Sequence, residues 1–388
     1  MTGVFLMRTL LLMISEDNFT MRTILNANMR TAVSVASVLV FLFFESCSLN
    51  VEEQLISGQA QGTTYVIKYI SEHSVSQYSV DSLLEVMDVE MNTWRKDSRI
   101  SQINEFSRVD TVFTFEDKSK IWTVLWDMTW EIHRDSDGAF DPTVKPLVDL
   151  WGFGLKDIET VDSTQVDSVM QFVGFRTENI DFDDVETRTQ YIESHISKGD
   201  GRSQLDFNAI AQGYTVDMLI DLLVDAGVEN AMVELGGEVR CMGLNKNGIA
   251  WRIAVDKPIA HDVVDGRPLQ AIIDVQDAAV CTSGNYRKFI EVDGMRYSHT
   301  LDPRTGYPSY NRLLSVTIQA QSAALADAYA TACMVLGAEE GVEFVEKMRD
   351  EKYGVPIEAL FIMKKENSDL EFEFWTTPGW SEDITWLN

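Results

Sequence analysis

The stretch SAALADAYATACMVL at residues 322–336 is the part of the chain that predicts most about its fold and its site. It is rich in Ala and has no Gly or Pro inside it, which favours an uninterrupted helix. Asp327 and Thr331 are four residues apart, so a helix places a carboxylate and a hydroxyl on one face, among side chains too small to block a phosphate. That face suits a hard cation. The alternative is a helix that packs through Ala against a sheet, with Asp327 merely solvated.

A polar segment upstream, HTLDPRTG at residues 299–306, favours the first interpretation. Pro303 and Gly306 make it a rigid turn. His299 is the one histidine of the five that lies in a motif. Imidazole suits a general base near neutral pH, so His299 is the candidate base, with the orientation of a phosphate as its alternative role.

The periodicity of the remaining chain predicts its fold class. The predicted strands are 62–70, 230–235, 238–244, 251–256, 269–275, 288–292, 296–301, 313–320, 357–364 and 370–376, and residues 190–208 are expected to give two more around the turn 198–201. The predicted helices are 80–94, 121–133, 214–226, 322–336 and 338–349. Because strands follow strands rather than alternating with helices, this order predicts an α+β fold with a mainly antiparallel mixed sheet and packed helices.

Two connecting stretches have a composition typical of sites. Residues 138–154, GAFDPTVKPLVDLWGFG, combine Gly and Pro with large apolar residues, so we expect no regular element there and a loop that lines something. In residues 206–217, DFNAIAQGYTVD, Ala209 is expected to begin a tight passage from a strand end into the helix. Backbone groups at such a passage favour metal-bound phosphates, although a plain strand-to-helix connection would have the same pattern.

Trp94 stands where the predicted helix 80–94 gives way to the polar loop RKDSRISQIN. An aromatic side chain at a helix end has two interpretations here. It caps the core, or it stacks on an aromatic ligand.

The chain is strongly acidic, with a formal net charge of −29 over 388 residues. Like charges repel phosphates, so this balance argues against a nucleic-acid or anionic-membrane binding surface. Any phosphate ligand therefore needs a bridging cation. Removing residues 1–46 takes away three basic and three acidic residues, so the acidity belongs to the remainder of the chain.

The N-terminal segment resembles an export signal. Residues 32–44, AVSVASVLVFLFF, are 13 uncharged residues, fewer than the roughly 20 that span a bilayer as a helix. Arg30 precedes the run and Cys47 follows it, the order of a secretory signal. We expect residues 1–46 to be removed and Cys47 to carry a lipid anchor, with Met21 or Met29 as alternative translation starts. Ordinary cleavage nearby and a retained anchor are the alternatives.

The other cysteines, Cys241, Cys281 and Cys333, stand in apolar surroundings without the spacing of metal ligands. They are expected to be buried thiols.

Six motifs occur in a fixed order along the chain: GAFDPTVKPL (138–147), DFNAIAQGY (206–214), ELGGE (234–238), TSGNYR (282–287), HTLDPRTG (299–306) and ADAYAT (326–331). Together they resemble the ApbE family, the FAD:protein FMN transferases. The resemblance covers roughly residues 58–376, and residues 299–306 are its most specific part. It implies an ApbE-like, T-fold-related form of the α+β fold, with residues 47–388 as the flavin transferase domain.

The activity that this resemblance implies is a magnesium-dependent transfer of the FMN half of FAD to a Ser or Thr of a target protein, with release of AMP. It also implies a lipid-anchored protein on the periplasmic side of the bacterial cytoplasmic membrane. The implied ligands of one or two Mg²⁺ ions are the backbone carbonyl of Ala209 and the side chains of Asp327 and Thr331. The implied FAD contacts are Gln61, Trp94, Ala139, Phe140, Asp141, Asp206, Gln212 and Leu301. The family often has Met at the position of Gln61 and Lys or Glu at that of Gln212.

The chemistry of such a transfer is consistent with these residues. Attack of a hydroxyl on a pyrophosphate requires neutralised charge and a base, for which Mg²⁺ held by oxygen ligands, with Asp327 among them, and His299 are suited. Two rival functions remain at this point: a metal-dependent FAD pyrophosphatase that gives FMN and AMP, and a non-catalytic FAD-binding lipoprotein.

Overall fold

The Ala-rich stretch forms the first part of α8 (Ala323–Glu351), in agreement with the predicted helix. Gly337 interrupts the helical backbone with a φ of 84°, so the two helices predicted on either side of it form one element with a kink. This computed structural model describes residues 52–153, 161–186, 192–259, 267–285, 289–292, 295–298, 300–351, 357–365, 371–380 and 384–387. The predicted signal segment at 1–46, Cys47 and His299 lie outside these residues.

Among the described residues, eight strands form the central sheet, and every neighbouring pair in it is antiparallel. In spatial order they are β1 (Glu53–Ala60), β2 (Thr63–Ile70), β6 (Asn230–Leu235), β7 (Glu238–Met242), β10 (Ala278–Gly284), β15 (Leu313–Ala320), β16 (Glu358–Lys364) and β17 (Phe372–Thr376). The predicted α+β fold with a mainly antiparallel sheet is confirmed. β1 and β10 were not predicted, because only one residue of β1 is buried and β10 ends in the polar residues Thr282 and Ser283 and in Gly284.

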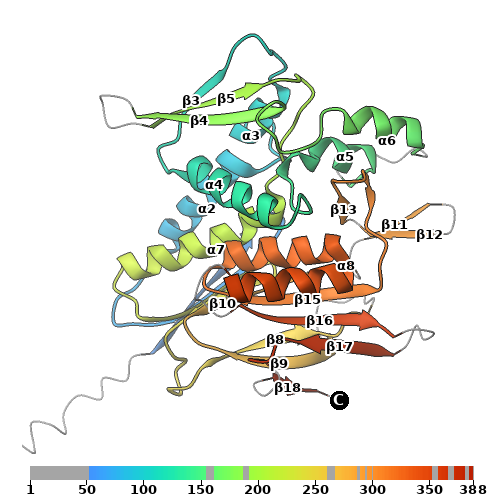
Figure 1. The fold of residues 1–388 in the computed structure, drawn as a ribbon. Helices are drawn as coiled ribbons and strands as arrows, with labels where there is room; N and C mark the ends of the chain where they lie inside the picture. Colours follow the sequence, from blue (N-terminus) through green and yellow to red (C-terminus); the bar gives the residue numbers. More distant parts are fainter. Residues whose placement is uncertain are drawn as a thin grey trace, which may run out of the picture. The chain divides into compact units, whose positions relative to one another are not determined.

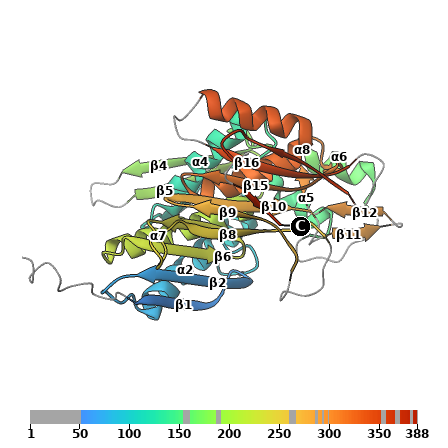
Figure 2. The same cartoon turned by 90° about the horizontal axis from the view of Figure 1, so that it is seen from below.

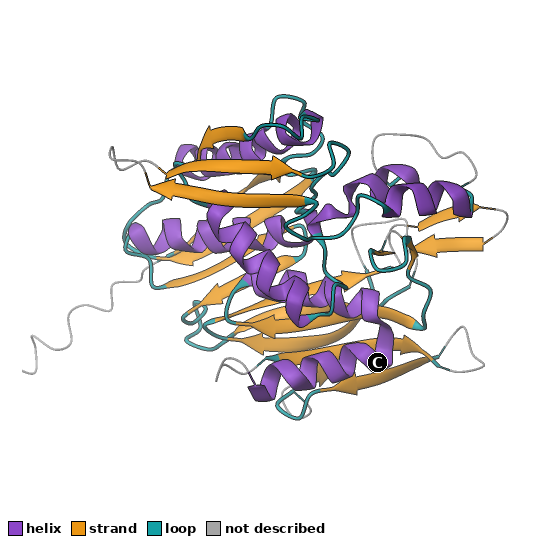
Figure 3. Cartoon of the chain, turned by 45° about the horizontal axis from the view of Figure 1, so that its top comes forward, coloured by secondary structure: helices purple, strands orange, loops and turns teal. Residues whose placement is uncertain are grey.

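Three layers are built around the central sheet in the part of the chain from residue 52 onward (Figures 1–3). Helices α7 (Asn208–Asp225) and α8 cover one face of the central sheet. A smaller antiparallel sheet covers the other face, in the order β18 (Ile384–Trp386), β9 (Leu269–Val275) and β8 (Trp251–Asp256). Each face of the central sheet therefore has its own apolar core.

The alternation of β7 decides which side chains reach the helices. Val239 and Cys241 belong to the core between the two sheets. Because successive strand residues point to opposite faces, Glu238 and Arg240 face the helices instead. The three cysteines of the described chain are buried and unpaired, as predicted.

The remaining elements lie beyond α7 and beside α8. They are α2 (Gln77–Met91), α3 (Arg99–Glu105), α4 (Ile121–Asp135), α6 (Ser163–Met170) and a sheet in the order β3 (Phe113–Glu116), β5 (Ile192–Lys198) and β4 (Ile180–Glu186). Two short hairpins are β11 (Phe289–Val292) with β12 (Met295–Ser298), and β13 (Leu301–Asp302) with β14 (Tyr307–Pro308). No helix in the described part of the chain combines the length and the apolar character needed to cross a bilayer.

Two expectations for the connecting stretches were wrong. The stretch 138–154 contains a 3-10 turn, η1 (Pro142–Val144), and a helix, α5 (Lys145–Leu150). Each begins with a proline in its first turn, where the missing N–H costs nothing, so the prolines start helices here rather than forbid them.

The second strand predicted within residues 190–208 does not form. β5 pairs with β4 and β3 instead. Beyond the end of β5, two glycines bring the chain against the backbone of distant residues. A Cβ on Gly199 would lie 1.8 Å from the Glu178 carbonyl oxygen, and one on Gly201 would lie 2.1 Å from that of Ser107. The helix that follows begins at Asn208 rather than 214, which places Ala209 inside α7.

Candidate active site

The crossing of α7 and α8 is the closest approach of two helices in the site. A Cβ on Gly213 would lie 2.3 Å from the carbonyl oxygen of Ala323, a distance that no side chain tolerates. Gly at this position therefore lets the two backbones touch. The Ala-rich sequence of α8 serves the same close contact.

Asp327 meets α7 at this crossing. Its side chain is buried, and its Oδ2 accepts the Gly213 N–H at 3.2 Å. Gly213 is four residues after Ala209, so its amide is the one that a regular helix directs at the Ala209 carbonyl. Two of the three predicted metal ligands, the Asp327 carboxylate from α8 and the Ala209 carbonyl of α7, are thus both directed toward the Gly213 amide.

Thr331 lies one turn further along α8. Its Oγ1 is 3.2 Å from the Oγ of Ser283, which is on β10. Sequence reasoning did not single out Ser283 as a site residue, although it belongs to the motif TSGNYR. The crossing therefore gathers a carboxylate and hydroxyl oxygens beside the first turn of α7.

Carboxylates dominate the electrostatics of this crossing. Burial raises the pKa of Asp327 well above its ordinary value, and the nearby carboxylates of Glu238 and Asp217 raise it further, while the Gly213 amide opposes them. Burial, with the same three carboxylates, also raises the pKa of the Cys281 thiol. No cluster of three or more His, Cys, Asp or Glu side chains arranged for a metal occurs in the described ranges. The crossing offers one central carboxylate and neutral oxygens.

Gln212 is part of α7, and Gln61 contacts the same stretch of that helix. Gln61 and Gly62, with φ of 50° and 74°, form the two-residue turn of the β1–β2 hairpin. The Gln61 amide donates to Thr215 Oγ1 at 2.8 Å. A Cβ on Gly236 would lie 2.2 Å from Gln212 Nε2, so the Gln212 amide rests on the glycine turn after β6.

Trp94 and Asp206 line one small pocket. Trp94 is 57% exposed, which rules out the interpretation that it caps the core. Asp206 Oδ1 accepts the Asn208 N–H at 2.8 Å, and burial raises the pKa of its carboxyl. The other lining residues are Thr93, Lys145, Val148, Phe153 and Asn208. The pocket is small, with a volume of about 30 Å³ against the ~300–1,000 Å³ of a pocket for a drug-sized ligand, so it does not enclose a ring system.

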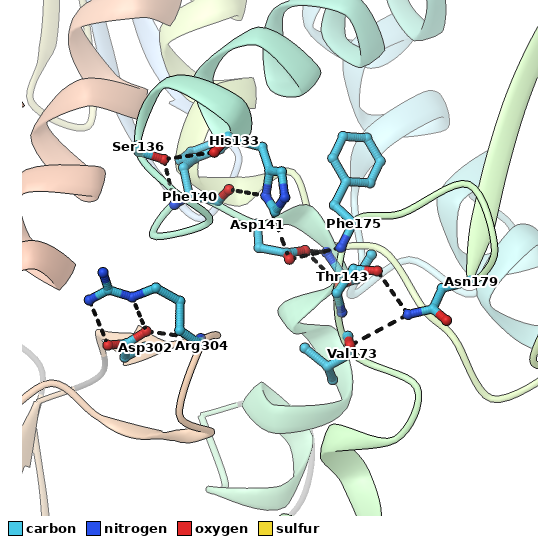
Figure 4. A network of polar contacts seen from close by, with 11 residues as sticks. His133, Ser136, Phe140, Asp141, Thr143, Val173, Phe175, Asn179, Asp302 and Arg304 are labelled. Carbon is cyan, nitrogen blue, oxygen red and sulfur yellow. Dashed lines mark hydrogen bonds and ion pairs between the residues drawn. The ribbon is translucent and has the colours of Figure 1, made fainter.

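Asp141 is the centre of a buried hydrogen-bond network (Figure 4). Its Oδ1 accepts from the amide and the hydroxyl of Thr143 at 2.7 and 2.6 Å, and its Oδ2 accepts the Phe175 N–H at 2.9 Å. His133 Nδ1 donates to the Phe140 carbonyl at 2.8 Å and lies 3.7 Å from Asp141. Ala139, Phe140 and Asp141 are all buried, so this segment holds its loop rigidly.

Leu301 belongs to a small apolar cluster that joins two motifs. It packs in one cluster with Leu147 and Trp151, and Trp151 Nε1 donates to the Gly306 carbonyl at 2.8 Å. Arg304 binds Asp302 through two nitrogens, at 3.0 and 2.9 Å (Figure 4). The turn after residue 299 is thereby fixed against the 138–151 segment.

The comparisons with known proteins all indicate the same family. The family model described as the ApbE family matches residues 61–355. The FAD:protein FMN transferase of Vibrio cholerae is 38% identical over 322 residues, covering 81% of this chain and 90% of that protein. The Haemophilus influenzae protein of the same name is 31% identical, over 81% of this chain and 89% of its own.

Solved structures are similar over most of the chain. The flavin transferase ApbE from Vibrio cholerae matches with a TM-score of 0.69 at 34% identity, covering 84% of this chain and 97% of that one. The apo form of the Pseudomonas stutzeri flavinyl transferase ApbE matches with a TM-score of 0.70 at 31% identity, over 86% and 96%.

Proposed function

The chain belongs to the ApbE family, and on that premise we propose that it is an enzyme that transfers FMN from FAD to a target protein. The observation that carries the proposal within the chain itself is the meeting of Asp327, the Gly213 amide and the first turn of α7. It unites two motifs that stand 114 residues apart at the point where a phosphate-bound cation would be needed.

Magnesium is the cation we propose for this crossing. The donors there are hard oxygens, and Mg²⁺ is commonly held by one or two carboxylates together with substrate phosphates. We assign its protein ligands to the Asp327 carboxylate, the Thr331 hydroxyl and the Ala209 carbonyl. When bound, it would neutralise the pyrophosphate and the phosphate that leaves. The absence of a rich carboxylate cluster in the described residues is consistent with this mode of binding.

We assign FAD to the surfaces around the crossing. The exposed ring of Trp94, beside Asp206, would stack on a ring of the dinucleotide, and Gln61 and Gln212 would contact the dinucleotide at α7. We also assign FAD contacts to the segment Ala139–Asp141 and to Leu301. FAD titration of single variants tests these eight residues one at a time.

In the transfer, an acceptor Ser or Thr oxygen bonds to the FMN phosphorus, and the bond from that phosphorus to the bridging oxygen breaks, which releases AMP. The acceptor hydroxyl must lose its proton. We assign the removal of that proton to His299, which acts as the general base. His299→Ala should lower single-turnover transfer by roughly 10²–10⁴ and leave FAD binding intact. An unaltered pH profile of the rate in the variant would remove this role.

One experiment separates the transferase from its rivals. The protein is incubated with FAD and Mg²⁺, with and without an acceptor domain, and the products are weighed by mass spectrometry. Transfer adds the mass of FMN to the acceptor, and a pyrophosphatase releases free FMN and AMP in both mixtures. A storage protein leaves FAD intact, and that outcome would refute catalysis.

We further propose that the protein is exported and anchored to the periplasmic face of the cytoplasmic membrane by lipid on Cys47. The support is the apolar run followed by that cysteine. A mature N-terminus at any residue other than Cys47, found by mass spectrometry of the protein from its native host, would refute lipidation.

A further inference from the structure

Asp217 joins the two helices of the crossing at a second point. It is one turn after Gly213 on α7, and its two carboxylate oxygens accept the N–H groups of Ala323 and Ala324 at 2.8 and 2.9 Å. These are the first two residues of α8. The free amides of one helix start are therefore satisfied by a carboxylate that another helix supplies.

Arg240 holds this carboxylate from the sheet. Its Nη1 donates to Asp217 Oδ1 at 2.7 Å. Arg240 reaches the helices because it alternates along β7 with the inward-facing Val239 and Cys241. The Asp217 side chain is 10% exposed and that of Arg240 is 25% exposed, so the pair is largely shielded from water.

The contacts of Asp217 and of Gly213 define the register of α8 on α7. On α7 they are four residues apart. On α8 they fall at the first residues and at Asp327, also one turn apart. With the backbones in contact at Gly213, a slide of α8 along α7 requires the loss of the Asp217 contacts.

We propose that Asp217, held by Arg240, is a positioning residue that sets the distance between the Asp327 carboxylate and the Ala209 carbonyl. This inference rests on the proposed function of the crossing as a Mg²⁺ site. Asp217 itself touches neither Mg²⁺ nor FAD. It acts through the placement of α8.

A positional role and an electrostatic role of Asp217 predict opposite changes in Mg²⁺ binding when the Arg240 charge is removed, so the two roles can be separated. If Asp217 acts only as a negative charge near the cation, loss of the Arg240 charge makes the site more negative and tightens Mg²⁺ binding. If Asp217 acts by position, loss of Arg240 frees its carboxylate and weakens Mg²⁺ binding. Asp217→Asn weakens binding in both cases, so Arg240→Met is the decisive variant.

The test measures Mg²⁺ binding to the full chain by calorimetry, without FAD, and amide hydrogen exchange at residues 323 and 324. We expect Asp217→Asn and Arg240→Met each to weaken Mg²⁺ binding by about tenfold, the lower end of the effect of residues that orient metal ligands. Exchange at the two amides should become faster in both variants, and Arg240→Lys should restore part of each effect. Arg202→Met, which removes an exposed pair with Asp200, is the matched control and should change neither quantity.

Tighter or unchanged Mg²⁺ binding by Arg240→Met would overturn the positioning role. Arg240 is partly exposed, so this variant decides the matter even where Asp217→Asn does not fold. A wild-type protein that binds no Mg²⁺ would overturn the metal site and this inference together. Normal wild-type binding with unchanged variants would overturn the inference alone.

Discussion

Asp141 and Asp327 are both buried carboxylates, and burial raises the pKa of each, yet their surroundings are opposite. Asp141 accepts three hydrogen bonds from Thr143 and Phe175 and has an imidazole close by. Asp327 accepts one, from Gly213, and its charged neighbours are the carboxylates of Glu238 and Asp217.

The difference separates a structural carboxylate from one suited to a ligand. Donors around Asp141 compensate the loss of water, so its charge holds a loop. Carboxylates around Asp327 add repulsion to that loss, which a cation would relieve. A buried acid among acids is therefore the better candidate for function.

The largest effect is expected from Asp327→Asn. We expect FMN transfer at saturating Mg²⁺ to fall by about 10²–10³, because the one central charge of the proposed site is lost. The free energy of unfolding without metal should stay the same or rise by roughly 1 kcal/mol, since a repelled buried charge disappears. Transfer assays and urea denaturation measure the two quantities.

Near-wild-type transfer by Asp327→Asn would remove the metal assignment. A large loss of stability in the apo variant would show instead that Asp327, like Asp141, holds the fold.

Asp141→Asn should give the reverse pattern. The amide group of Asn cannot accept all three hydrogen bonds, so we expect a loss of roughly 2–4 kcal/mol in the free energy of unfolding. The transfer rate of the folded fraction should change far less than in Asp327→Asn. Urea denaturation is the measurement, and Asp110→Asn, at an exposed ion pair with Arg108, is the control. Unchanged stability would contradict a structural role.

Lys198 extends the comparison to a buried cation. It is 2% exposed, its Nζ has no hydrogen-bond partner among the residues that the structure describes, and burial lowers its pKa from 10.5 to about 8. Below pH 8 both the folded and the unfolded chain carry the proton, so the contribution of Lys198 to the free energy of unfolding does not change with pH. Between pH 8 and 10.5 the unfolded chain binds more protons, so stability rises with pH, by on the order of 3 kcal/mol in total.

Lys198→Met should remove this rise and be more stable than wild type at pH 7. Denaturation curves of both proteins from pH 7 to 10.5 measure the difference. Parallel pH profiles would mean that Lys198 is compensated in the folded protein.

Trp94→Ala should have the smallest effect. Trp94 is exposed beside Asp206, so the variant should keep its stability and lose roughly 1–3 kcal/mol of FAD binding, the scale of base stacking on an aromatic ring. Fluorescence titration with FAD measures this. Unchanged affinity would remove Trp94 from the binding surface.

Periodicity was enough to predict six of the eight strands of the central sheet and the helices α2, α4, α7 and α8, because their buried faces repeat at regular spacing. It failed where distant backbone decides the local structure. Nothing in the sequence around Gly199 and Gly201 reveals the carbonyl groups against which they pack, so a second strand was predicted after β5. Likewise Pro142 and Pro146 predicted an interruption of regular structure, but they lie in the first turns of η1 and α5, where proline favours the start of a helix.

The site was predictable as motifs but not as contacts. Spacing placed Asp327 and Thr331 on one helix face, yet it could not show that Gly213 brings α7 against that face. Ser283, Lys145 and Asp217 carry no periodic signal that distinguishes them from ordinary polar residues. Their relevance follows only from which elements lie side by side.

The antiparallel crossing of α7 and α8 also has a consequence for folding. Its contacts join residues 106–114 positions apart, so a long loop must close before they form, and we expect them to form late in folding. A cation bound only by the completed crossing would leave the refolding rate unchanged and slow unfolding, because it stabilises the native state without touching the transition state. Stopped-flow kinetics with and without Mg²⁺ would detect this difference between the refolding and unfolding rates. In a compartment that contains magnesium, the proposed metal site would therefore also slow the unfolding of the protein.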